Sequence, residues 1–423
     1  MNIINNPHRS QWTSLLRRPV MDHSVLEATV QELLNKVKQG GDNALLELSQ
    51  RFDGVSLKKI QVSNEEIIVA EQQLSDELKA AIVQAKENIE KFHALQVRTV
   101  ERLETLPGVL CWRKSIGIEK VGLYVPGGSA PLFSTVLMLG MPAKLAGCRE
   151  IVLCTPPGKD GSIHPAILYA AKEAGITKIY KTGGAQAIAA MAFGTDTIPA
   201  VFKIFGPGNQ YVTCAKQLVQ REGVAIDMPA GPSEVCVLAD DTAKAAFVAA
   251  DLLSQAEHGP DSQVLLVSTS QKFSQQVLEE INFQLNDLPR KEIAQKALEN
   301  SKAIIVADIA EAMALVNEYA PEHLIISCEN DEDLAAQVVN AGSVFLGNYS
   351  PESVGDYASG TNHTLPTNGY AKAYSGVSVD SFVKKITYQK LSPEGLKNIA
   401  STVVRMAEAE GMQAHGNAVK RRM

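Results

Sequence analysis

The stretch Val121-Gly-Leu-Tyr-Val-Pro-Gly-Gly-Ser129 places a short apolar run directly before a glycine turn, and a helical pattern begins just after it, at about Leu132. The same order of strand, turn and helix repeats along the chain as far as Ile226. Strands that alternate with helices of ~10–15 residues indicate βαβ units around a parallel sheet. This series predicts strands at 121–125, 151–154, 178–181, 201–205 and 224–226, and helices from 132 and at 165–174, 185–193 and 210–221.

A second series of the same kind starts after Gly231-Pro232. It predicts helices at 243–257, 271–285, 310–319 and 332–341, and strands at 263–267, 303–306, 324–327 and 343–346. Two such arrays predict an α/β protein with two doubly wound, Rossmann-like domains and an extended helical C-terminal tail. Outside the arrays, helical periodicity covers residues 24–98, with a helix end at Gly40-Gly41 and a helix start at Ser75, and the tail carries one long helix at 392–410.

The turn-rich segments at both joints of the first array mark candidate domain boundaries. On this basis we expect residues 121–234 to form an inserted domain that binds a nucleotide cofactor. The flanking pieces, 20–120 and 235–373, would together form the other domain, and residues 374–423 would form the tail.

The composition is that of an ordinary globular protein, with 45% hydrophobic and 21% charged residues among 423. Forty basic residues against 47 acidic ones give a net charge of −7, so no nucleic acid is expected as a partner, because phosphate binding needs a clustered positive surface. No apolar run reaches the ~18 residues that span a bilayer, and residues 1–12 are polar, so neither a membrane nor a signal peptide is expected. Six scattered cysteines without a C-x-x-C pair are typical of reduced thiols in the cytoplasm.

Three glycine turns each follow a predicted strand and precede a predicted helix: Gly127-Gly128-Ser129, Gly183-Gly184 and Gly206-Pro207-Gly208-Asn209. A parallel sheet places all three at its carboxyl edge, where nucleotides usually bind. The third turn continues to Tyr211, where the dinucleotide fingerprint has a third glycine, and Asp227 ends the next strand, where a ribose-binding acid would fall. Such turns also close any βα junction, so on their own they fit a cofactor site and an ordinary turn about equally well.

Gln255 and His258 lie three residues apart at the end of a predicted helix, a spacing that puts both on one face, as two metal ligands require. A histidine at the C-terminal end of a helix can instead interact with the helix dipole, and for an isolated histidine this interpretation is favoured. Glu322 and His323 follow Pro321 at the start of a predicted strand, where both can serve one pocket only from the preceding loop.

The order of the elements adds a constraint on these polar residues. Both pairs fall where a helix leads into a strand, so they share the amino edge of the second sheet, whereas the glycine turns share the carboxyl edge of the first. If both clusters are functional, the two edges must face each other across a cleft. Further polar residues lie at Asp356, His363, Glu410 and His415, and each of them alone is more typical of a polar surface.

These residues belong to longer motifs. Ile226-Asp-Met-Pro-Ala-Gly-Pro-Ser-Glu234 and Asp251-Leu-Leu-Ser-Gln-Ala-Glu-His258 closely resemble the signature of the histidinol dehydrogenase family. The similarity extends through further blocks between about residues 120 and 416, in the expected order: Gly122-Leu-Tyr-Val-Pro-Gly-Gly-Ser-Ala-Pro131, Gly183-Gly-Ala-Gln-Ala187, Phe205-Gly-Pro-Gly-Asn209, Pro321-Glu-His-Leu324, Gly355-Asp-Tyr-Ala-Ser-Gly-Thr-Asn-His363 and Glu410-x4-His415. Several long, independent motifs make the resemblance specific.

The resemblance implies an enzyme that oxidises L-histidinol to L-histidine through L-histidinaldehyde, with two NAD⁺ and one zinc ion per site. It implies zinc ligands at Gln255, His258, Asp356 and His415, and substrate contacts from these four residues and from Ser233, His323 and Glu410. It implies an acid/base pair at Glu322 and His323, and NAD contacts at Tyr124, Gln186 and Asn209. It also implies a homodimer in which the tail with Glu410 and His415 crosses to the partner's site.

The residue types suit this chemistry. Imidazole and carboxylate ligands fit Zn²⁺, and an amide oxygen is unusual but acceptable. An imidazole with a pKa of ~6.5 can accept the alcohol proton as hydride leaves, and a carboxylate can activate the water that the second oxidation needs. Two other hypotheses remain open from the sequence: an aldehyde dehydrogenase with Cys154 as nucleophile, and a non-catalytic zinc- or imidazole-binding protein.

Overall fold

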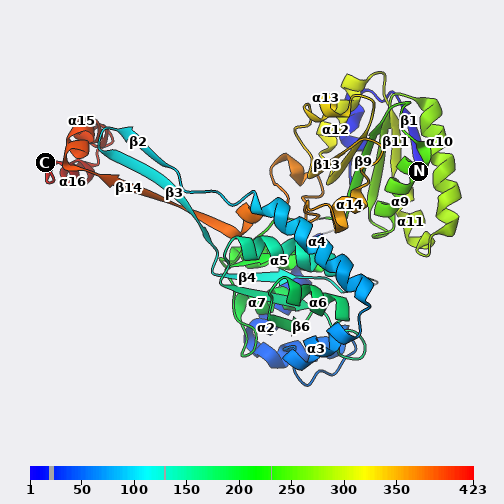
Figure 1. Ribbon diagram of the computed structural model, residues 1–423, viewed down its shortest axis with the longest axis horizontal. Helices are drawn as coiled ribbons and strands as arrows, with labels where there is room; N and C mark the ends of the chain where they lie inside the picture. Colours follow the sequence, from blue (N-terminus) through cyan, green and yellow to red (C-terminus); the bar gives the residue numbers. More distant parts are fainter. Residues whose placement is uncertain (19–22, 128–129, 230) are drawn as a thin grey trace.

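The computed structural model describes residues 1–18, 23–127, 130–229 and 231–423. Figure 1 shows two α/β units side by side and a long arm that leaves them and ends at the C-terminus. Each unit is built on its own parallel sheet, and the arm contains a small antiparallel sheet. Among the described residues, no helix is long and apolar enough to cross a membrane.

The first unit contains a five-stranded parallel sheet with the order β6-β5-β4-β7-β8. Its strands are β4 (Lys120–Tyr124), β5 (Glu150–Thr155), β6 (Lys178–Lys181), β7 (Lys203–Phe205) and β8 (Ala225–Ile226). Its helices are α2 (His23–Phe52), α3 (Asn64–Gln72), α4 (Asp76–Ala94), α5 (Phe133–Leu145), α6 (Pro165–Glu173), α7 (Gly184–Phe193) and α8 (Gln210–Arg221). The chain winds outward from β4 in one direction and from β7 in the other, so the sheet is doubly wound, as the sequence predicted.

The second unit contains a six-stranded parallel sheet with the order β1-β11-β10-β9-β12-β13. Its strands are β1 (Asn2–Asn5), β9 (Glu234–Ala239), β10 (Gln263–Ser268), β11 (Lys302–Ile305), β12 (His323–Ser327) and β13 (Ser343–Leu346). Its helices are α1 (Trp12–Leu15), α9 (Ala245–Ala256), α10 (Gln271–Gln284), α11 (Lys291–Glu299), α12 (Ile309–Tyr319), α13 (Asp331–Ala335) and α14 (Glu352–Tyr357). From β9 to β13 this sheet repeats the winding of the first, with the change of direction between β9 and β12.

The arm consists of two parts of the chain that lie far apart in the sequence. Its sheet has the order β14-β3-β2, with β2 (Arg102–Leu106), β3 (Val109–Gly117) and β14 (Val383–Leu391). The helices α15 (Pro393–Ala409) and α16 (Gln413–Lys420) pack at its end. Short 3-10 helices elsewhere in the chain lie at Arg9–Gln11, Leu285–Asp287, Tyr370–Lys372 and Val379–Phe382.

The expected grouping of residues 20–120 with residues 235–373 is wrong. Leu34 and Leu48 of α2 share a core with the five-stranded sheet, and Ile82 and Ile89 of α4 share another core with its opposite face. The strands β2 and β3 pair with β14 and belong to the arm. The apolar stripes of these helices would suit either sheet, and only the folded packing decides which sheet they cover.

Two strands of the second unit were not predicted from the sequence. The strand β9 lies in the middle of the six-stranded sheet, and all of its residues are buried. The strand β1 joins the edge of that sheet from the N-terminus by pairing with β11. The other strands of the two parallel sheets lie within one or two residues of their predicted positions, whereas the arm strands β2, β3 and β14 were not predicted. The helix α2 kinks at Gly41, which has a positive φ of 52°, where a helix end was predicted.

Candidate active site

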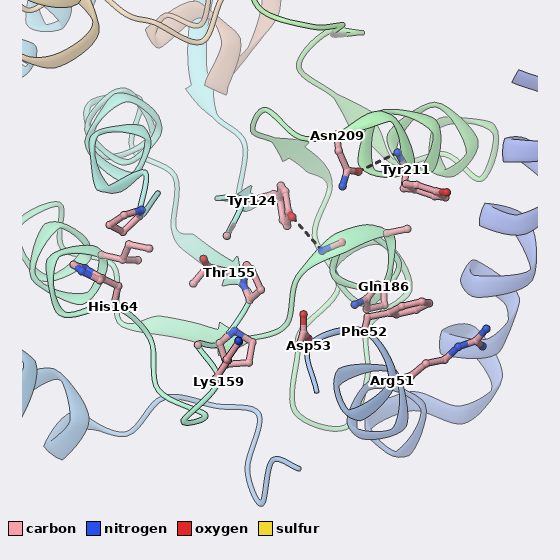
Figure 2. A pocket seen from close by; sticks show the side chains of 18 of the residues that line it. Arg51, Phe52, Asp53, Tyr124, Thr155, Lys159, His164, Gln186, Asn209 and Tyr211 are labelled. Atoms are coloured by element: carbon pink, nitrogen blue, oxygen red, sulfur yellow. Dashed lines mark hydrogen bonds between the residues drawn. The ribbon is translucent and has the colours of Figure 1, made fainter. Parts of the chain in front are cut away.

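A pocket of about 1160 Å³ lies at the carboxyl edge of the five-stranded sheet. It is lined by the three residues expected to contact a cofactor, Tyr124, Gln186 and Asn209, and Figure 2 shows their side chains around it. Tyr124 ends β4, Gln186 lies in the first turn of α7, and Asn209 caps α8. The pocket therefore lies where the strand order reverses between β4 and β7, the usual nucleotide position in such sheets. Gly128 and Ser129 of the first glycine turn lie outside the described residues.

The glycine turns bring the backbone close to the side chains of this pocket. The Tyr124 hydroxyl accepts a hydrogen bond from the Gly184 N–H at 3.1 Å. Burial raises the pKa of Tyr124 to about 12, so the phenol keeps its proton for a further acceptor. Gly206 has a positive φ of 126°, and a Cβ there would meet the Tyr124 carbonyl oxygen at 2.0 Å. Only glycine can fill this place in the turn.

Asp227 does not take the role of a ribose-binding acid. Its side chain is buried in an ion pair with Lys216 of α8, and one of its oxygens accepts from the Gly206 N–H at 2.8 Å. Lys216 donates to the Gly206 carbonyl oxygen at 2.9 Å, so the pair holds both ends of the same residue. Asp227 therefore supports the glycine turn that begins at Gly206, and its side chain is not free to bind a ligand.

Glu322 and His323 lie at the amino edge of the six-stranded sheet, where the sequence placed them. His323 begins β12 next to β9, and both side chains are almost fully buried. The Nδ1 of His323 lies 3.1 Å from the Glu234 carbonyl oxygen, and Glu322 accepts from the Glu234 N–H at 2.8 Å. Because a carbonyl can only accept, Nδ1 carries a proton in this arrangement. The opposite nitrogen, Nε2, lies 3.3 Å from Asp356 Oδ1.

The charged groups of this cluster shift one another's pKa values. Burial raises the pKa of Glu322 to about 8, against the attraction of His323. Burial disfavours the charged form of His323, but the carboxylates of Glu322 and Asp356 outweigh it and raise the pKa of His323 to about 10. Burial raises the pKa of Asp356, but the hydrogen bond with His323 lowers it, and the net result is a lowered pKa. An imidazole and carboxylates with perturbed pKa values in one place are typical of an acid/base site.

Gln255 and His258 lie at the end of α9 and reach the same cluster. Oriented so that both of its amide atoms are satisfied, Gln255 donates to Glu352 Oε1 and accepts from the Glu234 N–H, each at 3.0 Å. The Nδ1 of His258 lies 3.1 Å from the Ser254 carbonyl oxygen, which leaves its Nε2 for another ligand. His258 is also close enough to Asp356 to lower the pKa of that carboxyl.

These donors fit a zinc ion only in part. Within the described part of the chain, no three His, Cys, Asp or Glu side chains are arranged to hold a metal. Gln255, His258 and Asp356 together offer an amide oxygen, an imidazole nitrogen and a carboxylate, a donor set that zinc accepts but that lacks a fourth side chain. Beside them, Glu352 Oε2 is buried with no hydrogen-bond partner among the described residues, so a cation bound here would give this oxygen a partner.

The last two predicted site residues lie elsewhere in the same chain. Glu410 ends α15 and His415 lies in α16, both exposed. Figure 1 shows these helices at the far end of the arm, away from both sheets. Ser233, by contrast, directly precedes β9 and so lies at the amino edge beside Glu234.

The segment from Asp356 to Thr367 connects the two edges. His363 Nδ1 lies 2.8 Å from the Asp356 carbonyl oxygen, and its Nε2 lies 3.0 Å from the hydroxyl of Thr135 at the start of α5. Thr367 accepts a hydrogen bond from the Gly231 N–H. The carboxyl edge of the first sheet and the amino edge of the second thus adjoin through this segment, as expected from the order of the elements.

Cys154 is not suited to act as a nucleophile. It is fully buried in β5, and burial raises the pKa of its thiol far above the ordinary range. A nucleophilic cysteine needs a lowered pKa and access to substrate. This position contradicts the hypothesis of a cysteine-dependent aldehyde dehydrogenase that uses Cys154.

Three residues of the amino-edge cluster were not identified from the sequence. In the sequence, Glu234 is recognisable only as the last residue of the motif at 226–234, and no pattern marks Arg18 or Glu352 as a site residue. Arg18 lies 216 positions before its partner Glu234, so no local pattern could connect the two. Glu352 directly follows Tyr349-Ser-Pro351, and nothing in this stretch indicates that its side chain is buried.

The fold and these two adjoining sites define a two-domain α/β enzyme of the dehydrogenase type. The family model described as histidinol dehydrogenase matches residues 16–423, and the chain therefore belongs to that family. It is 62% identical to the histidinol dehydrogenase of Bacteroides thetaiotaomicron over 100% of this chain and 99% of that protein, and 54% identical to that of Vibrio parahaemolyticus over 97% of this chain and 95% of the other. The crystal structure of histidinol dehydrogenase from Elizabethkingia anophelis matches with a TM-score of 0.98 and 56% identity, covering 100% of this chain and 98% of that one.

The family identity makes this protein an oxidoreductase of histidine biosynthesis. It also removes the hypothesis of a non-catalytic binding protein.

Proposed function

We propose that this enzyme oxidises L-histidinol to L-histidine through L-histidinaldehyde, with two NAD⁺ and one zinc ion per site. The observation that carries the proposal is the buried pair Glu322–His323, which lies beside the donors Gln255, His258 and Asp356. The segment that begins at Asp356 connects this cluster through His363 to the start of α5, in the unit that contains the nucleotide-type pocket. Together these features can hold an amino alcohol, remove its proton and receive its hydride in one place.

His323 serves as the base of the first oxidation once zinc engages the Asp356 carboxylate, because that carboxylate is one of the groups that raise the pKa of this imidazole to about 10 in the metal-free chain. Its imidazole accepts the hydroxyl proton of histidinol while hydride leaves the same carbon, which becomes an aldehyde. Glu322 then activates a water molecule that adds to the aldehyde carbon, the hydrate loses a second hydride and a second proton, and the carboxylic acid that forms ionises with loss of a third proton. Histidinol, water and two NAD⁺ give histidine, two NADH and three protons, so the step balances.

The metal and the cofactor would each be held by a separate set of residues. Gln255, His258 and Asp356, with His415 from a second chain, would hold zinc, which when bound supplies a positive template for the substrate's amine and imidazole. Ser233 and Glu410 would contact the substrate. Tyr124, Gln186 and Asn209 would hold NAD⁺, which when bound accepts the hydride. The uncompensated Oε2 of Glu352 supports a site that takes up positive charge.

The enzyme is inferred to be a homodimer that shares each site between its chains. The arm exposes apolar side chains such as Leu103, Met406 and Met412, each more than half accessible to solvent. It also carries Glu410 and His415, which its own amino-edge cluster does not use. A second chain that covers the arm would bury this surface and complete both clusters. The free cysteines, Cys154 among them, fit a reducing compartment, so we infer that the dimer works in the cytoplasm.

The direct test is the rise in NADH absorbance when purified protein meets L-histidinol and NAD⁺. Two NADH per histidinol consumed, with histidine as product, would support the proposal. No NADH would contradict the substrate, and one NADH per histidinol with release of the aldehyde would contradict the two-step course. His323→Asn, which removes the imidazole and keeps an amide of similar position, is the matched inactive control.

A further inference from the structure

A buried ion pair lies behind the acid/base residues. The guanidinium of Arg18 contacts both carboxylate oxygens of Glu234, with Nε 2.7 Å from Oε1 and Nη2 2.8 Å from Oε2. The side chains are 12% and 2% exposed. Such a two-pronged contact fixes direction as well as distance, because both the guanidinium and the carboxylate are planar. Arg18 comes from the N-terminal segment between α1 and α2, outside both βα arrays.

Glu234 connects this ion pair to both members of the acid/base pair. Its N–H donates to Glu322 at 2.8 Å, and its carbonyl oxygen accepts from the Nδ1 of His323 at 3.1 Å. The position of one peptide segment therefore decides where the carboxylate lies and which nitrogen of the imidazole carries a proton. The Asn368 N–H also donates to the Glu234 carboxylate, at 2.6 Å, so this side chain is held from two sides.

The same guanidinium also holds the turn that leads into Glu322. Arg18 Nη2 donates to the Tyr319 carbonyl oxygen at 2.7 Å and lies within 3.4 Å of the Ala320 carbonyl oxygen. The guanidinium stacks over the Tyr319 ring at 4.0 Å from its centre. Ala320 has a positive φ of 53°, a conformation that a residue with a side chain seldom adopts without support from its surroundings. Arg18 therefore holds both the residue that begins β9 and the turn that leads into β12.

We propose that Arg18 is a positioning residue for the reaction, acting through Glu234 and the turn at 319–320 to hold Glu322 and His323 in their working geometry. The inference rests on the proposed function, because it assigns these two residues the proton transfers. Arg18 contacts neither substrate nor cofactor in this role. A shift of about 1 Å in a catalytic group can lower the rate by ~10²-fold, so loss of the anchor should act mainly on kcat.

The test uses Arg18→Lys in the full-length, zinc-loaded dimer. Lysine keeps the charge but cannot contact two carboxylate oxygens and two carbonyls at once. We expect kcat with histidinol to fall ~10- to 10²-fold, by the sensitivity of catalysis to position, while the KM for NAD⁺ and the zinc content stay at wild-type values. Arg221→Lys is the matched control, since Arg221 pairs with Glu27 on an exposed surface of the first unit. It should leave kcat unchanged.

A second variant covers the case in which the ion pair is needed for folding. Arg18→Met alone leaves a buried carboxylate without its cation, which is strongly destabilising. Arg18→Met with Glu234→Gln removes both charges, keeps the backbone of residue 234 and should fold with the same lowered kcat. Wild-type kcat in either Arg18→Lys or the double variant would overturn the inference. So would a loss of kcat that is matched by an equal loss of zinc or of NAD⁺ affinity, since that pattern indicates a general structural defect.

A readout without turnover separates this inference from the proposed function. In ¹⁵N-histidine-labelled protein, the proton on Nδ1 of His323 should give a slowly exchanging NMR signal, identified by its absence in His323→Asn. The signal should shift or broaden in Arg18→Lys and stay in place in Arg221→Lys. If wild-type protein does not oxidise histidinol, the proposed function fails, but the signal still decides on the positioning. An unchanged signal in Arg18→Lys would contradict it.

Discussion

The two sheets of this enzyme share their winding but use opposite edges. In the five-stranded sheet, the change of direction between β4 and β7 opens a pocket at the carboxyl edge. In the six-stranded sheet, the corresponding change between β9 and β12 is occupied at its carboxyl edge by Asp240, which accepts from the Thr242 N–H at 2.9 Å and from the Glu329 N–H at 3.0 Å. The proposed acid/base pair of that sheet, Glu322 and His323, lies at its other edge.

The difference follows from the residues at the ends of the central strands. In the first unit, β4 and β7 lead into glycine turns, where the backbone can approach a ligand closely. In the second unit, β9 leads into Asp240, whose carboxylate already accepts hydrogen bonds from the backbone of the turns after β9 and β12. A carboxylate in this place repels a phosphate. Two sheets with the same topology therefore need not carry the same kind of binding site, because a few residues at the strand ends decide which edge of the sheet can bind a ligand.

Removal of the metal should have the largest effect and should separate the two edges. Stripping zinc by chelation should abolish turnover, because Gln255, His258 and Asp356 depend on one ion for their common geometry. NAD⁺ binding, measured by titration calorimetry, should stay unchanged, because the cofactor pocket is on the other sheet. Full activity of metal-free protein in metal-free buffer would contradict the zinc proposal. Loss of NAD⁺ binding would show that the edges are not independent.

Hybrid dimers test whether the amino edge needs the arm of a second chain. His258→Ala and His415→Ala chains should each be inactive alone. If the arms cross, one site of the hybrid dimer contains both substitutions and the other site contains neither. Activity and bound zinc should therefore return at one site per dimer. The hybrid of His258→Ala with Asp356→Ala is the control, since both of its sites keep one lesion and stay inactive. If the first hybrid shows no activity above its parents, the arms do not cross.

Glu322→Gln should divide the two oxidations within the amino edge. The amide keeps the shape and can still accept from the Glu234 N–H, but it cannot activate water. We expect oxidation of histidinal to slow by ~10²- to 10⁴-fold, the usual share of a general base, and oxidation of histidinol to slow less. Glu329→Gln, at the other end of the same strand, should change neither rate. Equal losses with both substrates would reject the division of labour.

Much of this comparison was accessible from the sequence. The apolar runs bounded by glycine and proline gave the strands, and their order placed Glu322, His323, Gln255 and His258 at one edge of the second sheet. The glycine turns gave the other edge. These predictions succeed because periodicity and turn chemistry are local properties of the chain.

What the sequence did not reveal depends on contacts between distant segments. The strand β9 begins with Glu234, an acid that can be buried only because Arg18 pairs with it from far away in the chain. The helices α2 to α4 carry apolar stripes that do not say which sheet they cover. Asp227 follows its strand where a ribose-binding acid is expected, and only the position of Lys216 turns it into a structural residue.

The smallest effect is expected at the carboxyl edge, where Tyr124→Phe tests the cofactor pocket alone. Phenylalanine keeps the ring but leaves the Gly184 N–H without its partner and removes the hydroxyl proton that can face the cofactor. One hydrogen bond contributes ~1 kcal/mol, so the KM for NAD⁺ should rise roughly fivefold. Zinc content should not change. The pKa of Tyr124 is raised to about 12 by burial, so the phenol stays protonated and the variant should keep the wild-type pH dependence around neutrality.

Tyr180→Phe is the matched control for this last change. Tyr180 is equally buried, and burial raises its pKa to about 12 as well, but it lies in β6 and is not among the residues that line the pocket. Its variant should leave the KM for NAD⁺ at the wild-type value. If Tyr180→Phe raises that KM as much as Tyr124→Phe does, the effect comes from loosened packing of the sheet, and Tyr124 has no specific contact with the cofactor. A rise in Tyr124→Phe alone assigns the contact to the end of β4, where the strand order reverses.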